Sequence, residues 1–532
     1  MTQGFGTLNE AVDSDTTSTG ERDGIYLLNG SIDHDFALTI VAAEGSGARP
    51  VLQPGIAEGG ESSRPFRSRA DITLRGLHLT NRDELGGLNT RILRVSADDV
   101  RITIDDCHFD EDAQSGIRLD NENNRIFISN SIFSRIGLPL DPNNGRGIDD
   151  RGNPIDSLVI QNSTFYNLTS TVLRDGGGII RYADINHNTV VNIGQRGFDF
   201  GEIQTLHFTN NVVINAGYLG AAPADDDPAF PRNVIIVDTL GVDIVGDQVV
   251  NVRNNNFYTD QALIDALHDS VTSILVLGTF NALAADLVEA SGTGATNTSE
   301  AIAFANPPAS VEPIITAYYI DPATAPAWDN ASAPYDFLYS GGESSTGSTG
   351  GQPLGSLTWH TLDIVDSDRT TSLVVDDGGT GDAVELPTGD IGPIGLDLDL
   401  AAGDQMVRQT ATNPVAGDEV TIDIIITEGA SGEGGLNISL LWNPAELTYK
   451  GYVGVDIFSG GIVLTTPGNI VAADSTADLS VVFLGNFASK DSGSGGQATF
   501  TVNEGFSGVT TVTLTAAKLG GDVTIGPGAA LL

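Results

Sequence analysis

The stretch that decides the fold reads Leu158-Val-Ile-Gln-Asn-Ser-Thr-Phe165. Its first, third and eighth residues are apolar, and its fifth residue, Asn162, is polar. Six further segments repeat this pattern without gaps; they begin at Ile72, Ile102, Ile126, Ala183, Leu206 and Val250. Because alternating apolar residues mark a strand with one inward face, each segment is predicted to be a strand, a polar corner and a second strand.

The fifth position forms a largely polar column when the segments are aligned. The column reads Gly76, Asp106, Asn130, Asn162, His187, Asn210 and Asn254. Asn tolerates the left-handed αL conformation, and its amide can bond to the layers above and below. We therefore predict a sharp corner here, stacked from one repeat to the next.

The spacing of the repeats indicates a solenoid. Successive segments start 30, 24, 32, 25, 23 and 44 residues apart, and a coil of roughly 20–25 residues is one rung of such a fold. The excess residues are expected to loop outward at 81–89, 138–154 and about 218–247. A third strand completes each coil; these strands lie at 92–95, 117–119, 148–150, 173–175 and 198–200. The prediction is an all-β, right-handed parallel β-helix.

Charge and composition exclude several classes of function. The 532 residues carry a formal net charge of −45, which repels nucleic acid and anionic membranes. No apolar run is long enough for membrane insertion. The first lysine is Lys450, so the repeat region has only arginine as its basic residue. The acidity fits a surface adapted to high salt, a calcium-binding surface, or both. The single cysteine, Cys107, allows no intrachain disulfide and is expected to be buried.

The N-terminal residues resemble a known group. The segment 7–12 followed by Gly24-Ile-Tyr-Leu-Leu28 is similar to the opening of the secreted pectate-lyase-like β-helix superfamily, and the phrases at 162–167 and 254–258 are typical of its coils. The resemblance covers about 7–359 and implies a short capping helix before the first strand. It also implies a secreted or cell-surface location, with a signal peptide already removed. The superfamily includes lyases, hydrolases, adhesins and inert spacers, so the fold alone does not name an activity.

A second domain is predicted behind the solenoid. We expect the solenoid at 1–360, a linker at 361–394 and a jelly-roll-like β-sandwich at 395–532. The strand patterns at 415–426 and 435–447 resemble the cohesin family over about 403–523. That resemblance implies a module for assembly with other cell-surface proteins, or a plain structural part. Polysaccharide, such protein modules and further copies of this chain are the expected partners.

The third-strand column suggests carbohydrate chemistry. Elimination on an acidic polysaccharide needs a base and a cation that neutralises the uronate. The predicted catalytic residues are Arg174, Arg118, Asp149 and Asp199. The predicted substrate-binding residues are Arg94, Asp175 and Arg196. The predicted calcium ligands are Asp149, Asp150, Asp225, Asp226 and Asp227. The alternative is a surface ladder of opposite charges without catalysis, and we favour that ladder.

Two further chemistries are less well supported by the sequence. Asp149 or Asp150 with a carboxylate on a neighbouring rung has the spacing for glycoside hydrolysis, but the Gly-His-Gly and Arg-Ile-Lys motifs of polygalacturonases are absent. His78 and His108 fall in one column. A stacked pair on the outer face is favoured over a metal site there, because no third ligand repeats with them.

The sequence thus favours a structural or carbohydrate-binding β-helix protein with a cohesin-like assembly module. The alternative is a calcium-dependent polysaccharide lyase or another carbohydrate-active enzyme. Calcium is the only cofactor suggested, and no organic cofactor is expected.

Overall fold

A computed structural model describes residues 5–12, 16–219, 232–241, 244, 248–270, 277–328 and 335–365, together with the strands named below and residues 431, 456–458 and 503 in the C-terminal part. The chain divides into two compact units, residues 1–368 and 369–532. None of the described helices combines the length and apolar character that a membrane crossing requires.

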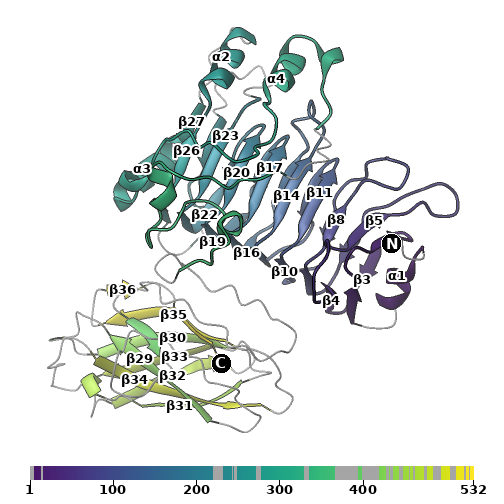
Figure 1. The fold of residues 1–532 in the computed structure, drawn as a ribbon. Helices are drawn as coiled ribbons and strands as arrows, with labels where there is room; N and C mark the ends of the chain where they lie inside the picture. The colour runs from purple at the N-terminus through teal and green to yellow at the C-terminus, as the bar shows by residue number, and fades with distance from the viewer. Residues whose placement is uncertain are drawn as a thin grey trace. The chain divides into compact units, whose positions relative to one another are not determined.

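The first unit is a stack of parallel strands in three nine-stranded sheets (Figure 1). The first sheet contains β1 (Thr17–Gly20), β4 (Leu38–Ala42), β7 (Ile72–Arg75), β10 (Arg101–Asp105), β13 (Asn124–Ser129), β16 (Ile155–Gln161), β19 (Ile179–Asn186), β22 (Glu202–Thr209) and β25 (Val249–Arg253). The second contains β2 (Ile25–Leu28), β5 (Val51–Pro54), β8 (His78–Thr80), β11 (His108–Asp112), β14 (Ile132–Ile136), β17 (Thr164–Leu168), β20 (Thr189–Ile193), β23 (Val212–Ala216) and β26 (Asn256–Tyr258). The third contains β3 (Ile32–His34), β6 (Phe66–Ser68), β9 (Leu93–Val95), β12 (Ser115–Leu119), β15 (Arg146–Asp149), β18 (Thr171–Arg174), β21 (Phe198–Asp199), β24 (Arg232–Ile236) and β27 (Leu277–Phe280).

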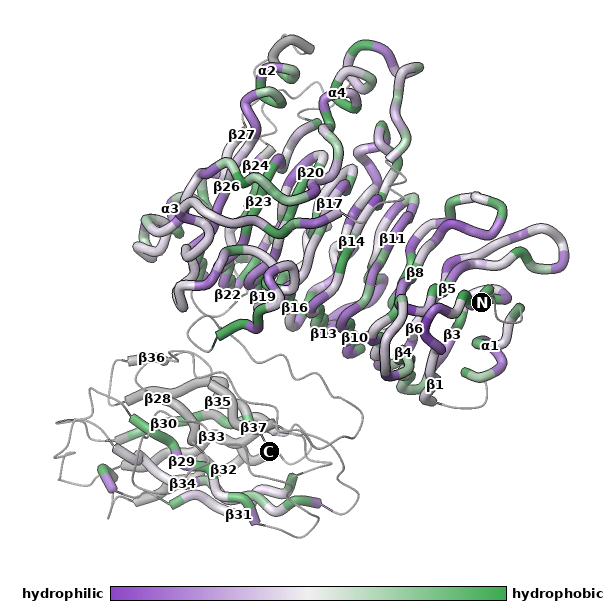
Figure 2. The backbone as a smooth tube through the Cα atoms, in the orientation of Figure 1, coloured by the Kyte–Doolittle hydropathy of each residue, from purple (hydrophilic) through white to green (hydrophobic). Residues whose placement is uncertain are grey.

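The predicted register of the repeat is confirmed. Ile102 pairs with Ile72 and Ile126, and each later segment pairs with the next at its first residue. The first, third and eighth positions of all seven segments are buried in one apolar core. Phe109, Phe133 and Phe165 stack there on successive rungs, with ring centroids 4.7 and 4.9 Å apart. Figure 2 shows the resulting alternation of apolar and polar residues along the strands.

The corner between the first and second sheets differs in one respect from the prediction. All seven residues of the predicted column have φ between 50° and 69°, as the αL expectation requires. The continuous buried ladder, however, runs one position later. Asn188, Asn211, Asn255 and Asn297 bond from side chain to side chain on successive rungs. The later position wins because its side chain turns inward, where the backbone groups of two rungs need partners.

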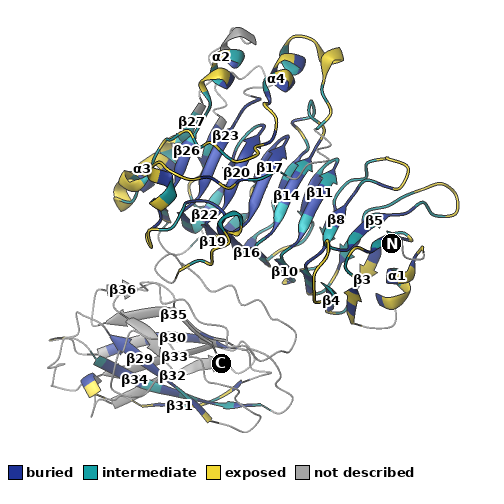
Figure 3. Ribbon diagram, viewed as in Figure 1, coloured by how far each residue is buried: buried dark blue, intermediate teal, exposed yellow. Residues whose placement is uncertain are grey.

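Helices and a long return segment close the solenoid. Helix α1 (Thr7–Val12) precedes the first strand, as the family resemblance implied. Helix α2 (Gln261–Ser270) lies where its apolar spacing predicted, and it packs with α4 (Glu312–Tyr319). Neither α4 nor α3 (Ala282–Ser291) was predicted, since this part of the chain has no repeat. The return segment, residues 335–360, packs on the outer face of β17, β20 and β23. Those strands are accordingly buried on both faces (Figure 3).

The second unit consists of two antiparallel sheets. One contains β28 (Ile394–Asp397), β29 (Glu419–Ile426), β34 (Gly493–Val502) and β31 (Leu447–Val453). The other contains β32 (Ile462–Val471), β33 (Thr476–Val482), β30 (Gly435–Trp442), β35 (Thr511–Leu519), β36 (Val523–Ile525) and β37 (Gly528–Leu531). Trp442 of one sheet meets Phe500 of the other with ring centroids 5.3 Å apart. The two sheets therefore form a β-sandwich, as predicted.

Candidate functional site

The third sheet places one charged side chain per rung on its outer face. Its inward residues are core residues such as Phe66, Leu93 and Ile117. The residues that alternate with them point outward and pair in register; from β6 to β21 they are Arg67, Arg94, Arg118, Asp149, Arg174 and Asp199. The predicted column is therefore a real stripe, with rungs about 4.8 Å apart. The loops at 81–89 and 137–145 leave from the corner beside this sheet.

Arg94 and Arg118 share one carboxylate. The Nε atom of each guanidinium contacts Asp120, Arg118 at 2.6 Å. Burial acts to raise the pKa of Asp120, but the hydrogen bonds from Arg118 and Arg94 outweigh it and hold that pKa below its usual range. Asp120 is therefore ionised, and it compensates one of these two positive charges.

Two neighbouring arginines have no carboxylate partner. Nε of Arg64 is shielded from solvent and has no hydrogen-bond partner among the described residues, and Nε of Arg91 donates to the neutral amide of Gln114 at 2.5 Å. Burial lowers the pKa of both guanidinium groups, and the nearby arginines lower it further. We call Arg64, Arg67, Arg91, Arg94 and Arg118 the arginine cluster. Asp120 and a shared Asp33 are its carboxylates among the described residues, so the cluster has excess positive charge.

Sequence reasoning found only part of this cluster. Arg94 and Arg118 were predicted, whereas Arg64, Arg67 and Arg91 were not. A signal was present: Arg64-Pro-Phe-Arg67 and Arg91-Ile-Leu-Arg94 place the same Arg-x-x-Arg phrase on successive rungs. It was missed because the first arginine of each phrase stands in the corner before the strand.

The predicted catalytic residues further along the stripe are held in ion pairs. Asp149 is fully buried and receives Arg146 and Arg174, each at 3.0 Å. Arg196 pairs with Asp199 within one rung. Burial raises the pKa of Asp199 to about 6, against the opposing effect of Arg196. The structure thus places Arg174 beside Asp149, as expected, in the kind of charge ladder that the sequence favoured.

The predicted calcium ligands do not form a calcium cage in the described part of the chain. Both carboxylate oxygens of Asp149 are taken by arginines. Asp150 accepts two backbone N–H groups, from Gly152 at 2.9 Å and Gly176 at 2.7 Å. Burial and the adjacent Asp175 raise the pKa of Asp150 well above its usual range, so the two carboxyl groups share a proton. Calcium takes six to eight oxygen ligands, which this pair does not supply. Asp225, Asp226 and Asp227 lie outside the described residues.

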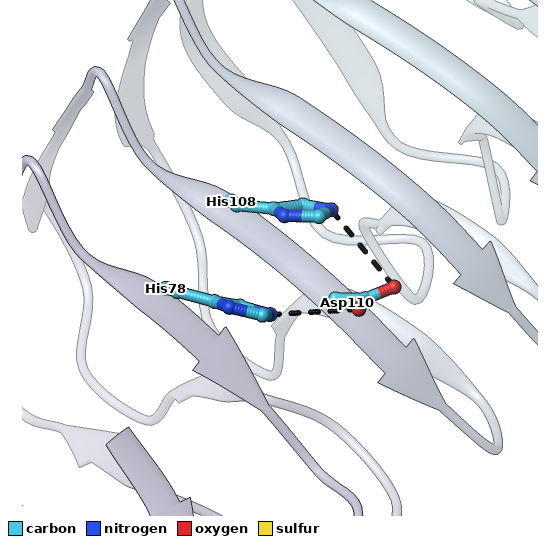
Figure 4. A group of neighbouring side chains, drawn as sticks. All are labelled: His78, His108 and Asp110. Atoms are coloured by element: carbon cyan, nitrogen blue, oxygen red, sulfur yellow. Dashed lines mark ion pairs between the residues drawn. The ribbon is translucent and has the colours of Figure 1, made fainter. Parts of the chain in front are cut away.

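A second polar cluster lies on the outer face of the second sheet. His78 of β8 and His108 of β11 pair in register, and their rings stack with centroids 4.6 Å apart, as predicted. Both imidazoles point toward Asp110, which lies two residues after His108 on the same face (Figure 4). Asp110 was missed, although the strand period of two places it there. Burial lowers the pKa of His108 to about 3, against the opposing effect of Asp110.

Comparison with known proteins identifies the repeat but no characterised relative. Residues 92–274 match the family model described as a right-handed β-helix region. No curated protein matches the chain.

Solved structures similar to part of the chain are cohesins. The sixth cohesin of scaffoldin B from Acetivibrio cellulolyticus, in complex with a Cel5 dockerin, is 10% identical, with 25% of this chain and 95% of that chain covered and a TM-score of 0.19. A cohesin module of a family 33 glycoside hydrolase from Clostridium perfringens is 14% identical, covering 23% and 90%, with a TM-score of 0.20. A non-cellulosomal cohesin from Archaeoglobus fulgidus is 14% identical, covering 22% and 82%, with a TM-score of 0.18. Likeness at this level carries no functional argument. The three parallel sheets and the family match together establish a right-handed parallel β-helix, followed by a smaller antiparallel β unit.

Proposed function

We propose that the solenoid binds an acidic polysaccharide on the outer face of its third sheet, at the arginine cluster. The observation that carries the proposal is the excess of guanidinium groups over carboxylates at this one place on a chain of net charge −45. A protein so acidic gains nothing in solubility from gathered arginines. Partly desolvated positive charges without partners are costly to fold, so an anionic ligand is the natural counter-charge.

The geometry supports a linear polyanion. Arg67, Arg94 and Arg118 lie on three successive rungs and repeat about every 4.8 Å. A guanidinium presents planar, paired donors that match a carboxylate or a sulfate ester. A polymer with one anionic group per sugar can therefore meet one arginine per rung. Arg91 and Arg64 add positive charge at the edge of the same face.

Binding is proposed in preference to elimination. A base must give up its own proton before it removes one from the substrate. Arg174, the predicted base, lies 3.0 Å from the buried carboxylate of Asp149, and this ion pair favours the charged guanidinium. The cluster arginines that lack such a partner are better placed to hold a uronate than Arg174 is to deprotonate one.

The test compares two double variants by affinity electrophoresis and calorimetry. Arg64→Gln/Arg91→Asn removes the two guanidinium groups without a carboxylate, and Asn suits the left-handed backbone of Arg91. Arg181→Gln/Arg253→Gln removes the same charge from exposed positions on the first sheet. Polygalacturonate and alginate are the acidic probes, and a neutral glucan is the control polymer.

We expect the cluster variant to bind the acidic polymers at least tenfold more weakly, and the first-sheet variant to bind like the parent protein. Affinity should fall as salt rises, because counterions compete for the same guanidinium groups. Equal losses in both variants, or equal binding of the neutral glucan, would overturn the proposal. An ultraviolet assay for unsaturated products on the same samples tests elimination separately.

The second unit is proposed to link the solenoid to other proteins outside the cell. This part of the proposal rests on the sequence resemblance of residues 403–523 to the cohesin family, and the extracellular location rests on the resemblance of residues 7–359. Pull-down with a panel of dockerin modules tests the linking role. Binding of none of them would leave a purely structural role for this unit.

A further inference from the structure

We propose that His78, His108 and Asp110 form a binding site for a divalent transition metal such as Zn²⁺, which joins two rungs of the solenoid. One ligand atom from each of the three side chains lies within 4.8 Å of the other two. Two imidazoles and one carboxylate are a donor set that suits zinc and its neighbours, whereas calcium and magnesium prefer oxygen alone.

The distances fit such an ion with small adjustments. Nε2 of His78 lies 3.4 Å from Oδ2 of Asp110, and Nε2 of His108 lies 3.9 Å from Oδ1. Two ligand atoms bound about 2.0–2.1 Å from a tetrahedral zinc ion lie about 3.4 Å apart. A rotation of the His108 ring by a fraction of an ångström at Nε2 therefore completes the set.

One donor atom is otherwise unexplained. Nε2 of His78 is shielded from solvent and has no hydrogen-bond partner among the described residues. A buried polar atom without a partner carries a desolvation cost, which a metal bond removes. Nε2 of His108 has a hydrogen bond with Ser134 at 2.8 Å, which it would exchange for the metal bond.

The surroundings hold the carboxylate in place without opposing a cation. Nε of Arg135 donates to Oδ1 of Asp110 at 2.9 Å, and Ser134 donates to the same oxygen at 2.7 Å. Each carboxylate oxygen has a second lone pair, so these bonds leave room for a metal. Glu111 contacts both Arg135 and Arg82, at 3.4 and 2.8 Å. The two arginines are thus balanced by two carboxylates, and no excess positive charge repels the ion.

The site lies on a part of the second sheet that the return segment 335–360 does not cover. Side-chain exposures of 29% for His78 and 20% for His108 leave a path for the ion and a free coordination position. His78 stands on β8, and His108 and Asp110 stand on β11. An ion bound here would therefore tie neighbouring rungs together and stabilise the stack.

The experiment uses the full chain without a polyhistidine tag, freed of metal with a chelator. Zn²⁺ binding is measured by calorimetry and by the shift in melting temperature, with Ca²⁺ at equal concentration as the comparison ion. Co²⁺ provides a spectroscopic readout, since imidazole coordination gives it visible absorption bands. The variants are His78→Ala and Asp110→Asn, and His207→Ala is the control because it removes an imidazole from the first sheet.

We expect one Zn²⁺ per chain, a higher melting temperature with Zn²⁺ than with Ca²⁺, and visible Co²⁺ bands. His78→Ala should weaken Zn²⁺ binding at least tenfold and abolish the bands, while His207→Ala should change neither. Because Asp110 also pairs with Arg135, only the His78 variant decides if Asp110→Asn fails to fold. Equal Zn²⁺ affinity in the parent protein and His78→Ala, or an equal effect of Ca²⁺, would overturn the assignment.

Discussion

At the scale of single residues, the corner ladder carries more of the stability than its small side chains suggest. Asn211 accepts the backbone N–H of Asn188 at 2.8 Å and donates to the carbonyl of Ile185 at 2.8 Å. Asn211→Leu leaves both groups buried without partners, so we expect a loss of about 3 kcal/mol in the free energy of unfolding. Denaturant titration measures it. The exposed Asn143→Leu is the control, and a similar loss there would contradict the ladder.

Two adjacent aspartates should respond in opposite ways to the same substitution. Asp149→Asn removes the charge that Arg146 and Arg174 share, and we expect a cost of about 2–4 kcal/mol at neutral pH. Asp150 already holds a proton because burial and Asp175 raise its pKa, so Asp150→Asn should change the stability by less than about 1 kcal/mol.

The pH dependence of stability gives a second measurement on this pair. Above about pH 4 the unfolded chain releases the Asp150 proton while the folded chain retains it. The parent protein therefore loses stability from this group as pH rises toward the folded-state pKa, and Asp150→Asn does not. The stability of the variant relative to the parent should increase with pH. A difference that is flat with pH would show that Asp150 is ionised in the folded state.

At the scale of elements, the return segment is fastened at a corner of the solenoid. Oδ1 of Asn162 accepts the backbone N–H groups of Leu357 at 2.6 Å and Thr358 at 3.2 Å, and Trp359 donates to Thr164 at 2.8 Å. Asn162→Gly keeps the αL corner but removes the two bonds to the segment. Hydrogen exchange over residues 335–360 should become faster, with little change in the first and second sheets.

The matched control for this change is Asn130→Gly, at the same corner one rung earlier. Its amide bonds to Asp105 and to Asn162 rather than to the return segment. Equal acceleration of exchange in both variants would mean that loss of the corner side chain, not release of the segment, loosens this region.

At the scale of the whole molecule, charge sets the response to salt. A net charge of −45 repels itself in the compact state, and screening relieves that repulsion. We expect the melting temperature to rise from about 20 mM to about 500 mM NaCl, while the affinity for an acidic polysaccharide falls in the same titration. Calcium acting well beyond matched ionic strength would indicate specific carboxylate sites outside those described above. No response of stability to either salt would contradict both explanations of the acidity.

The sequence by itself determined the solenoid and its register. Parallel rungs repeat the same local pattern, so a residue's column follows from its place in the coil, as the in-register pairing of Leu158 with Ala183 shows. The αL corners followed as well, because a one-residue turn between strands leaves few backbone choices. The earliest strands, such as Leu38–Ala42, were not in the aligned set, since their corners lack the Asn-containing phrase.

Only the tertiary structure decided which charges are paired and what covers the sheets. Arg94 and Arg118 share Asp120 while Arg64 and Arg91 have no carboxylate, and no column pattern distinguishes these cases. The return segment reaches Asn162 from 195 residues away in sequence and carries no repeat. Backbone register is a local property that repetition amplifies. Ion pairing and cover depend instead on corner loops and side-chain rotamers, which differ at every rung.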